Sequence, residues 1–454
     1  MPSRALRSSS PRIVLAGLLR SRCAKPILTL ALVAGMVLAS PLTSFAGVTI
    51  LVVDKSATPK IWRLHDANND GSITNDATEV NIWFDGSNLA GTPNFGNFAA
   101  FNVRQSDNTI IAGDVTNHRY CWLKDLDNNG DAQGALESRV ILTAANLSGA
   151  SLSAPTGNGF FPNGDYMICN SGSGTNVNPD AVYRLHDANG NGNYDDAGDV
   201  TPWVVNWPGF GVGNSPYVPF EVSTDPNGVS YMKSSGANNG IYKFADTNGN
   251  GRADDAGELV PWCTSANLSG VTLGAGFALE LDVTRPRSFY FNQTVTIAGA
   301  STKQILRATD LDFNGDANGV GEVVVVYSVV DSGFLTQDIV SLPGGDILVS
   351  DTAGKRIIRL HDLDGDGLFT SPGERTDFFL AGAGPVLDVR QLVLLRDIPV
   401  CRADFNNSGA LSVQDIFDFL SAWFAVDPRA DFNGANGVSV QDIFDFLAAW
   451  FAGC

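Results

Sequence analysis

Basic side chains are scarce in this sequence. The chain has 29 Lys and Arg residues against 48 Asp and Glu residues, and its formal net charge is −19. Nucleic acids and anionic membranes are bound by basic surfaces, so this balance argues against both as partners. Charged residues make up only 17% of the chain and Gly is abundant, which is typical of turn-rich proteins. The hydrophobic fraction of 44% suffices for a large core and argues against wholesale disorder.

Several catalytic signatures are also missing. The sequence has no nucleophile elbow, no HExxH motif and no phosphate-binding glycine loop. Of its four histidines, His65, His186 and His361 occupy one position of a repeat, and His118 stands in an Asn-His-Arg turn. Equivalent positions of different repeats cannot converge on one centre. We therefore expect the three repeated histidines to pack or hydrogen-bond locally and the His118 turn to be structural, which gives little support to a histidine-based active site.

The first 46 residues have the pattern of an export signal. They contain six basic residues and no acid, with an apolar run at 27–39 that leads to Ser44-Phe45-Ala46. This order predicts a secretory signal peptide cleaved after Ala46. A transmembrane anchor is the alternative, but the run is short for a span, and no later segment is long and apolar enough to cross a bilayer. The prediction is a secreted or cell-surface protein.

A repeated unit fills residues 47–398. Its marker is a strand-like segment closing on an aspartate, and the six copies end at Asp66, Asp125, Asp187, Asp246, Asp310 and Asp362. Each unit consists of short β-rich runs bounded by Gly, Asn and Asp, without helical periodicity. In the last unit we expect strands at 334–340, 346–350, 356–361 and 376–380. Four antiparallel strands repeated six times predict an all-β, six-bladed β-propeller, because ring closure protects the sheet edges.

The two ends of this region are offset by one strand. It starts with what reads as the second strand of a blade, at 48–53. An unpaired inner-strand candidate, 386–392, follows the sixth outer strand. We therefore expect the C-terminal segment to complete the N-terminal blade and so close the ring.

The strand, turn and strand pattern at 345–358 resembles the NHL-repeat propellers. The segment 109–119, with its Asn117-His118-Arg119 turn, resembles them as well. The resemblance covers residues 47–398 as architecture. It implies no single function, since that superfamily includes scaffolds, binders and enzymes.

An acidic loop follows the third strand of every unit. Positions 1, 3 and 5 are Asp or Asn, position 6 is Gly, and a late acid follows at position 13, or 14 in the first copy. Calcium prefers six to eight hard oxygen ligands, which such a loop can supply. These residues also simply form turns, but six loops with the same Gly and late acid favour EF-hand-like calcium sites. The predicted ligands are Asp66, Asn68, Asp70, Glu79, Asp125, Asp127, Asn129, Glu137, Asp187, Asn189, Asn191, Asp199, Asp246, Asn248, Asn250, Glu258, Asp310, Asp312, Asn314, Glu322, Asp362, Asp364, Asp366 and Glu374.

Five polar residues of the inner-strand candidates directly precede a Val or Ile. They are Asn102, Glu221, Asp282, Asp338 and Asp388. If their side chains point inward, they would ring the central channel and could hold a cation, as in propeller hydrolases of the lactonase type. The alternative is that they pin neighbouring turns by hydrogen bonds.

The composition shifts in the last residues, 400–454. Two near-copies, 404–415 and 431–442, each lead into an apolar helix, expected at 416–425 and 443–452. This module resembles a dockerin of the Gly-Cys-ending type seen in secreted planctomycete proteins. The resemblance implies one calcium site at Asp404, Asn406, Ser408, the Ala410 carbonyl, Ser412 and Asp415, and a second at Asp431, Asn433, the Gly437 carbonyl, Ser439 and Asp442. The second loop departs from the pattern, with Ala435 at position 5 and Asn436 where Gly is expected.

The module carries more large apolar groups than so small a unit easily buries. The dockerin resemblance implies that part of this surface docks on a cohesin-like or anchoring partner; the alternative is that the helices pack only on each other. Cys401 and Cys454 bracket the module, and either a disulfide or a free anchoring cysteine fits this placement. For Cys121, Cys169 and Cys263 the sequence indicates no pairing.

Two hypotheses of function follow. The first is an exported, calcium-binding propeller that serves as a binding or structural module for a carbohydrate or protein ligand, anchored by its dockerin-like tail. The second is a secreted enzyme, of the lactonase or sugar-dehydrogenase type, acting on a carbohydrate-related substrate at the propeller centre. The missing catalytic signatures favour the first.

Overall fold

The computed structural model describes residues 47–68, 70–89, 96, 98–143, 152–172, 180–194, 196–207, 211–212, 217–225, 227–236, 238–264, 272–330, 333–382, 384–396, 403–406, 411–433 and 437–453. The predicted signal peptide lies outside these residues, as do Ser408, Ala410 and the two cysteines that bracket the C-terminal module, Cys401 and Cys454. Within the described part of the chain, no helix is long and apolar enough to span a bilayer.

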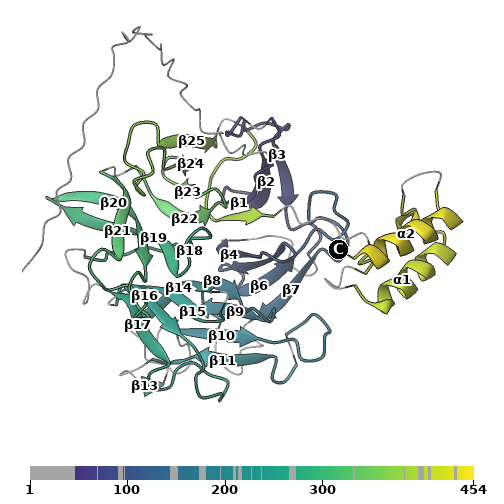
Figure 1. Cartoon of the computed structure of the whole chain (residues 1–454), viewed down its shortest axis with the longest axis horizontal. Helices are drawn as coiled ribbons and strands as arrows, with labels where there is room; N and C mark the ends of the chain where they lie inside the picture. The colour runs from purple at the N-terminus through teal and green to yellow at the C-terminus, as the bar shows by residue number, and fades with distance from the viewer. Residues whose placement is uncertain are drawn as a thin grey trace, which may run out of the picture. The chain divides into compact units, whose positions relative to one another are not determined.

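Six four-stranded antiparallel sheets form the blades of a propeller and surround a common centre (Figure 1). The all-β six-bladed architecture predicted from the repeats is confirmed. From inner to outer strand, blade 1 contains β26 (Leu392–Leu395), β1 (Thr49–Asp54), β2 (Lys60–His65) and β3 (Val80–Phe84); blade 2 contains β4 (Phe98–Arg104), β5 (Thr109–Asp114), β6 (Arg119–Leu123) and β7 (Ser138–Thr143); and blade 3 contains β8 (Pro155–Phe160), β9 (Tyr166–Asn170), β10 (Ala181–Leu185) and β11 (Val200–Val204).

The remaining blades follow the same order. Blade 4 contains β14 (Tyr217–Thr224), β15 (Ser230–Gly236), β16 (Gly240–Phe244) and β17 (Leu259–Thr264); blade 5 contains β18 (Leu279–Leu281), β19 (Ser288–Ile297), β20 (Ala300–Thr309) and β21 (Val323–Val329); and blade 6 contains β22 (Thr336–Ser341), β23 (Ile347–Asp351), β24 (Arg356–Leu360) and β25 (Arg375–Leu380). A short hairpin of β12 (Asn206–Trp207) and β13 (Gly211–Val212) follows blade 3. The strands expected in the sixth unit match those of blade 6 within two residues at each end.

The C-terminal segment completes blade 1, as predicted. Strand β26 pairs antiparallel with β1, with Leu394 opposite Ile50 and Val393 opposite Leu51. The predicted strand position, 386–392, was wrong: the strand begins where that segment ends. The reason is that carboxylates take up the backbone amides there, since Leu387 donates its N–H to Asp54 and Val389 donates to Asp388.

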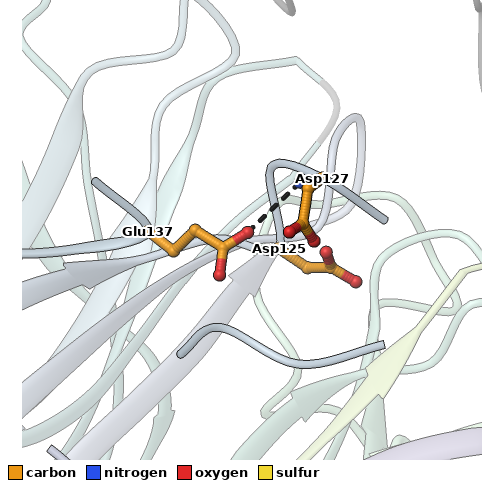
Figure 2. Close-up of side chains that lie close together, drawn as sticks. All are labelled: Asp125, Asp127 and Glu137. Carbon is orange, nitrogen blue, oxygen red and sulfur yellow. Dashed lines mark hydrogen bonds between the residues drawn. The ribbon is translucent and has the colours of Figure 1, made fainter. Parts of the chain in front are cut away.

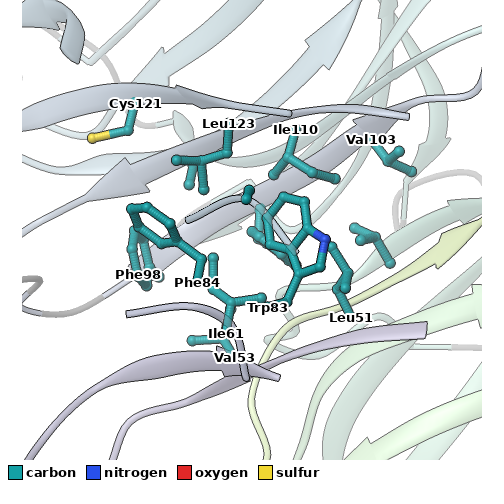
Figure 3. Close-up of a cluster of buried hydrophobic side chains, with 14 of the residues drawn as sticks. Leu51, Val53, Ile61, Trp83, Phe84, Phe98, Val103, Ile110, Cys121 and Leu123 are labelled. Atoms are coloured by element: carbon teal, nitrogen blue, oxygen red, sulfur yellow. The ribbon is translucent and has the colours of Figure 1, made fainter. Parts of the chain in front are cut away.

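The hydrophobic core lies between blades. In Figure 3, Leu51, Val53 and Trp83 of blade 1 pack with Ile110 and Leu123 of blade 2. Five further buried clusters join the other neighbouring blades in the same way, the one between blades 6 and 1 included. Because a strand buries side chains on both faces here, each blade depends on both neighbours.

Three of these interblade regions contain a cysteine. Cys121, Cys169 and Cys263 are free and fully buried. Burial raises the pKa of the Cys121 thiol and of the Cys263 thiol to about 12. These residues therefore behave as small apolar side chains of the core.

The C-terminal module contains α1 (Val413–Phe424), the short 3-10 helix η2 (Pro428–Ala430) and α2 (Val440–Ala452). Both α-helices start three residues before the predicted positions, because Ser412 and Ser439 form capping boxes. Phe419 and Phe446 stack at 4.1 Å with an interplanar angle of 1°. These two residues occupy equivalent positions of the two near-copies, 27 residues apart in the sequence.

Two tryptophans make equivalent hydrogen bonds between the halves of the module. Trp423 donates its indole N–H to the Ser439 carbonyl at 2.7 Å, and Trp450 donates to the Ser412 carbonyl at 3.0 Å. The last turn of each helix is thus hydrogen-bonded to the N-cap residue of the other helix. The two halves of the module hold each other through equivalent contacts.

The β26–β1 pairing predicts the effect of truncation. A chain ended after residue 385 should melt at least about 10 °C lower than a chain ended after residue 396, because the edge of β1 is opened and buried Leu392 and Val393 are lost. Thermal unfolding followed by circular dichroism measures the difference. Equal melting temperatures would contradict closure of the ring by β26.

Candidate metal loops and central cavity

Each acidic loop connects the third strand of a blade to its outer strand. We number the loops by blade: 66–79, 125–137, 187–199, 246–258, 310–322 and 362–374. The position-6 glycines all have a left-handed φ, between 79° and 98°, which a side chain would strain. In five loops the Asp at position 1 accepts the N–H of this glycine, for example at 2.9 Å from Gly130 to Asp125.

The late acids lie at the base of the loops and are at most 4% exposed. In every loop this carboxylate accepts one N–H from position 2 and one from position 9 or 10. Glu137, for instance, accepts from Leu126 at 2.7 Å and from Gly134 at 2.5 Å. A carboxylate has about four lone-pair positions, so these bonds leave room for a cation.

Three loops bring their carboxylates together most closely. In loops 2, 5 and 6, oxygens of the acids at positions 1, 3 and 13 lie within 4.8 Å of one another. Figure 2 shows Asp125, Asp127 and Glu137 of loop 2 side by side. Burial, together with repulsion from the carboxylates of Glu137 and Asp127, raises the pKa of Asp125 to about 6. A bound cation would relieve this repulsion.

Loops 3 and 4 contain an acid that the sequence analysis missed. These loops have Asn at both positions 3 and 5, and an aspartate at position 10 lies beside both amides. Asp196 accepts from Asn189 at 2.6 Å and from Asn191 at 2.9 Å, and Asp255 does the same for loop 4. An Asp at position 10 occurs in both Asn-rich loops, and this shared pattern could have identified the acid from the sequence. It supplies a carboxylate where the earlier positions supply amides.

The two C-terminal loops are alike in their described residues. Asp415 accepts the N–H groups of Ser412 and Asn406, and Asp442 accepts those of Ser439 and Asn433. The amides of both asparagines donate to a second helix acid, Asp418 or Asp445, which the sequence analysis did not name. Asp404, Asp431 and Gly437 are also described, whereas Ser408 and Ala410 lie outside the described residues.

A cavity of about 1100 Å³ lies among the inner strands. Asn102, Glu221 and Asp338 line it, as predicted for inward-pointing residues. Asp282 and Asp388 do not: Asp282 caps the turn after β18 through Thr284, and Asp388 binds Arg390 at 2.9 Å. The acid contributed by blade 5 is instead Glu280, on β18 itself.

The cavity residues also connect the blades. Ser341 of blade 6 donates its N–H to Glu280 of blade 5 at 3.0 Å. Leu392 of blade 1 donates its N–H to Asp338 of blade 6 at 2.8 Å. Asn102 donates to the Asn158 carbonyl at 3.0 Å. The turn-pinning alternative is therefore right for Asp282 and Asp388, whereas the cavity residues combine cross-blade bonds with access to the cavity.

Burial perturbs the cavity carboxyls. It raises the pKa of Glu280 to about 8 and that of Asp338 to about 7, and it raises the pKa of Glu221 well above its usual value. Repulsion from Asp338 adds to the shift of both glutamates. One oxygen of Glu221, Oε1, is buried without a hydrogen-bond partner in the described structure. Such groups hold protons near neutral pH.

The three repeated histidines bond locally, as expected. His65 contacts Thr49 at 2.9 Å, His186 contacts Asp165 at 2.7 Å, and His361 contacts Asp346, each within its own blade. His118 lies in a turn and contacts the Ser153 carbonyl at 2.6 Å. None of the four lines the cavity.

Comparisons with known proteins return structural matches only. No family model and no curated sequence matches the chain. A chain of the nidogen/laminin complex is similar, with 12% identity, a TM-score of 0.49 and coverage of 77% of this chain and 99% of that one. A gluconolactonase from Xanthomonas campestris has 12% identity, a TM-score of 0.41 and coverage of 65% and 78%. Virginiamycin B lyase from Staphylococcus aureus has 13% identity, a TM-score of 0.40 and coverage of 74% and 85%.

The raised pKa values predict how stability depends on pH. Because Glu280 and Asp338 titrate near 8 and 7 when folded and near 4 when unfolded, the folded state binds more protons between these values. Their contribution to stability is therefore complete below about pH 4 and is lost as the pH rises through 7 to 8. Glu280→Gln should thus match the wild type at pH 4 and exceed it by a few kcal/mol at most at pH 8.5.

Urea unfolding at pH 4, 6 and 8.5 measures this difference. Asp377→Asn removes one carboxylate, as Glu280→Gln does, but at an exposed position of blade 6. It is the control and should leave the pH dependence unaltered. A constant offset between Glu280→Gln and wild type at all three pH values would show that folding does not raise the pKa of Glu280.

Proposed function

We propose that the chain is an exported calcium-binding propeller that serves as a binding or structural module and is attached to a surface or complex by its C-terminal module. The observation that carries the calcium assignment is the loop geometry: six loops of one design, three of which gather three carboxylates within 4.8 Å. Carboxylate and amide oxygens are the donors that calcium prefers. The loops also contain half of the acidic residues, so filling them would neutralise much of the net charge of −19.

Attachment is supported by two equivalent apolar faces. Val413, Phe417 and Phe424 on α1 correspond to Val440, Phe444 and Phe451 on α2, and all six are between 58% and 77% exposed. The alternative that both helices bury their apolar residues only against each other does not account for these side chains. Exposed aromatic clusters of this kind are typical of protein interfaces. The proposed partner is a cohesin-like or anchoring protein that binds either face.

Calcium removal tests the metal assignment. Millimolar calcium should raise the melting temperature by at least about 10 °C over excess chelator, since each site filled to a hundred times its Kd adds about 2.7 kcal/mol. Differential scanning calorimetry measures the shift. Magnesium is the control and should give a much smaller shift, because it needs a tighter octahedral site. Unchanged melting in chelator would exclude stabilising calcium sites.

Paired substitutions test the attachment surface. Phe417→Ser or Phe444→Ser alone should reduce retention of the full chain on the envelope fraction of the producing cell by no more than about twofold, because one face remains. The double variant should lose at least about tenfold, as expected when an aromatic anchor is lost. Quantitative pull-down measures retention, and Leu387→Ser, an exposed propeller position, is the control. Full retention of the double variant would argue against these faces.

A second candidate function is favoured by the cavity. Carboxyl groups with pKa values of about 7 and 8 in a space of about 1100 Å³ suit general acid–base catalysis at neutral pH. In this case the protein would be an enzyme for a carbohydrate-related substrate, such as a lactone or sugar. The Glu280→Gln variant tests this candidate: turnover of a lactone or sugar by the wild type that the variant loses would support an enzyme, whereas no turnover by the wild type would favour the binding or structural module.

A further inference from the structure

Each outer strand whose pairing is described contains a bulge. Strands β3, β7, β11, β17, β21 and β25 each have one extra residue, namely Trp83, Ile141, Trp203, Trp262, Val326 and Phe378. A bulged residue is left out of the ladder, so its backbone groups can bind another segment. Bulges at one position in all six blades indicate a shared role.

The acidic loop of the following blade binds this residue. In five blade pairs, the N–H at loop position 8 donates to the bulge carbonyl: Ile73 to Phe378, Ala132 to Trp83, Ala253 to Trp203 and Phe369 to Val326 at 2.8 Å, and Ala317 to Trp262 at 2.7 Å. In the sixth pair, Tyr194 and Ile141 lie in one buried cluster. The pair Ile73 and Phe378 joins blade 1 to blade 6, across the closure of the ring.

Additional hydrogen bonds connect loops 4 and 5 to the preceding blade. In loop 5, Lys243 of blade 4 donates to the Gly315 carbonyl, and Thr264 donates its N–H to Asn318 at 3.0 Å. In loop 4, Val205 donates to Asp254 at 2.9 Å. The position-8 side chains themselves are buried in the interblade clusters. The loops are therefore part of the contact between blades.

The peptide group that makes this bond also belongs to the candidate metal site. In EF-hand loops, the backbone carbonyl of position 7 is a calcium ligand. That carbonyl and the N–H of position 8 belong to one planar trans peptide and point in opposite directions. A cation on the carbonyl would polarise the peptide and strengthen the N–H bond to the neighbouring blade.

We propose that the loops are metal-dependent clasps between adjacent blades, so that filling them strengthens the contact at the five junctions where the position-8 bond is present. This inference rests on the proposed calcium binding. Loop 1 then fastens the junction of blades 6 and 1 at the outer edge, whereas β26 fastens it at the inner edge. Turn-forming loops without a cation would hold the same contacts but would not respond to calcium.

Hydrogen exchange at loop 5 tests the clasp in the full chain. Calcium should slow exchange of residues 259–264, which lie on blade 4, by about tenfold relative to chelator, as expected for a modestly strengthened local bond. Asp312→Ala with Asn314→Ala removes two ligands of loop 5 and should abolish this slowing, while residues 80–84, which contact loop 2, keep theirs. Asp377→Ala removes an acid of blade 6 that pairs with Arg356 and Arg375; it is the control and should leave the slowing at 259–264 as in the wild type.

Calorimetric calcium titration separates the possible failures. One site fewer in the double variant, with the slowing at 259–264 intact, would overturn the clasp and leave calcium binding standing. No binding by the wild type would overturn both proposals.

A milder variant covers the case in which the double variant unfolds. Asn318→Ala keeps the ligands and removes only the acceptor of the Thr264 N–H. It should keep the calcium stoichiometry, and the slowing of exchange of the 259–264 segment by calcium, relative to chelator, should be smaller than in the wild type. An unchanged slowing there would count against the clasp.

Discussion

Packing between neighbouring blades is the constraint on which the structure depends. Six of the buried clusters each join two blades, so a single blade has no core of its own. This arrangement explains why the outer strands bulge toward the next blade, why the cavity carboxyls accept amides from a neighbour, and why β26 returns from the far end of the chain. Stability is therefore a property of the ring.

The sequence allowed the fold to be predicted because the repeat is visible in it. The loop aspartates and the position-6 glycines mark every blade, and the offset ends predicted that the C-terminal segment completes blade 1. Two details depended on tertiary contacts. Glu280 faces the cavity in place of Asp282 because β18 ends at Leu281, and the strand predicted at 386–392 is delayed because the amides of Leu387 and Val389 bind carboxylates. The bulges that receive the loops follow from pairing between strands, which no local pattern encodes.

The carboxylates occur in two contrasting environments. Those of the loops accept several backbone N–H groups, and in three loops the oxygens of three acids lie within 4.8 Å of one another. Those of the cavity have few donors and hold protons instead, as the raised pKa values of Glu280 and Asp338 show. One kind of side chain can thus suit cation binding at the loops and proton exchange at the centre. The net charge alone does not distinguish these two uses.

The buried thiols can report whether a contact between blades has opened. Cys121, Cys169 and Cys263 lie in the clusters between blades 1 and 2, 3 and 4, and 4 and 5. While the blades stay in contact, each sulfur is shielded from oxidants and alkylating reagents and remains protonated. A molecule that has opened at one of these junctions would carry a modified cysteine there, and peptide mapping could identify which junction had opened.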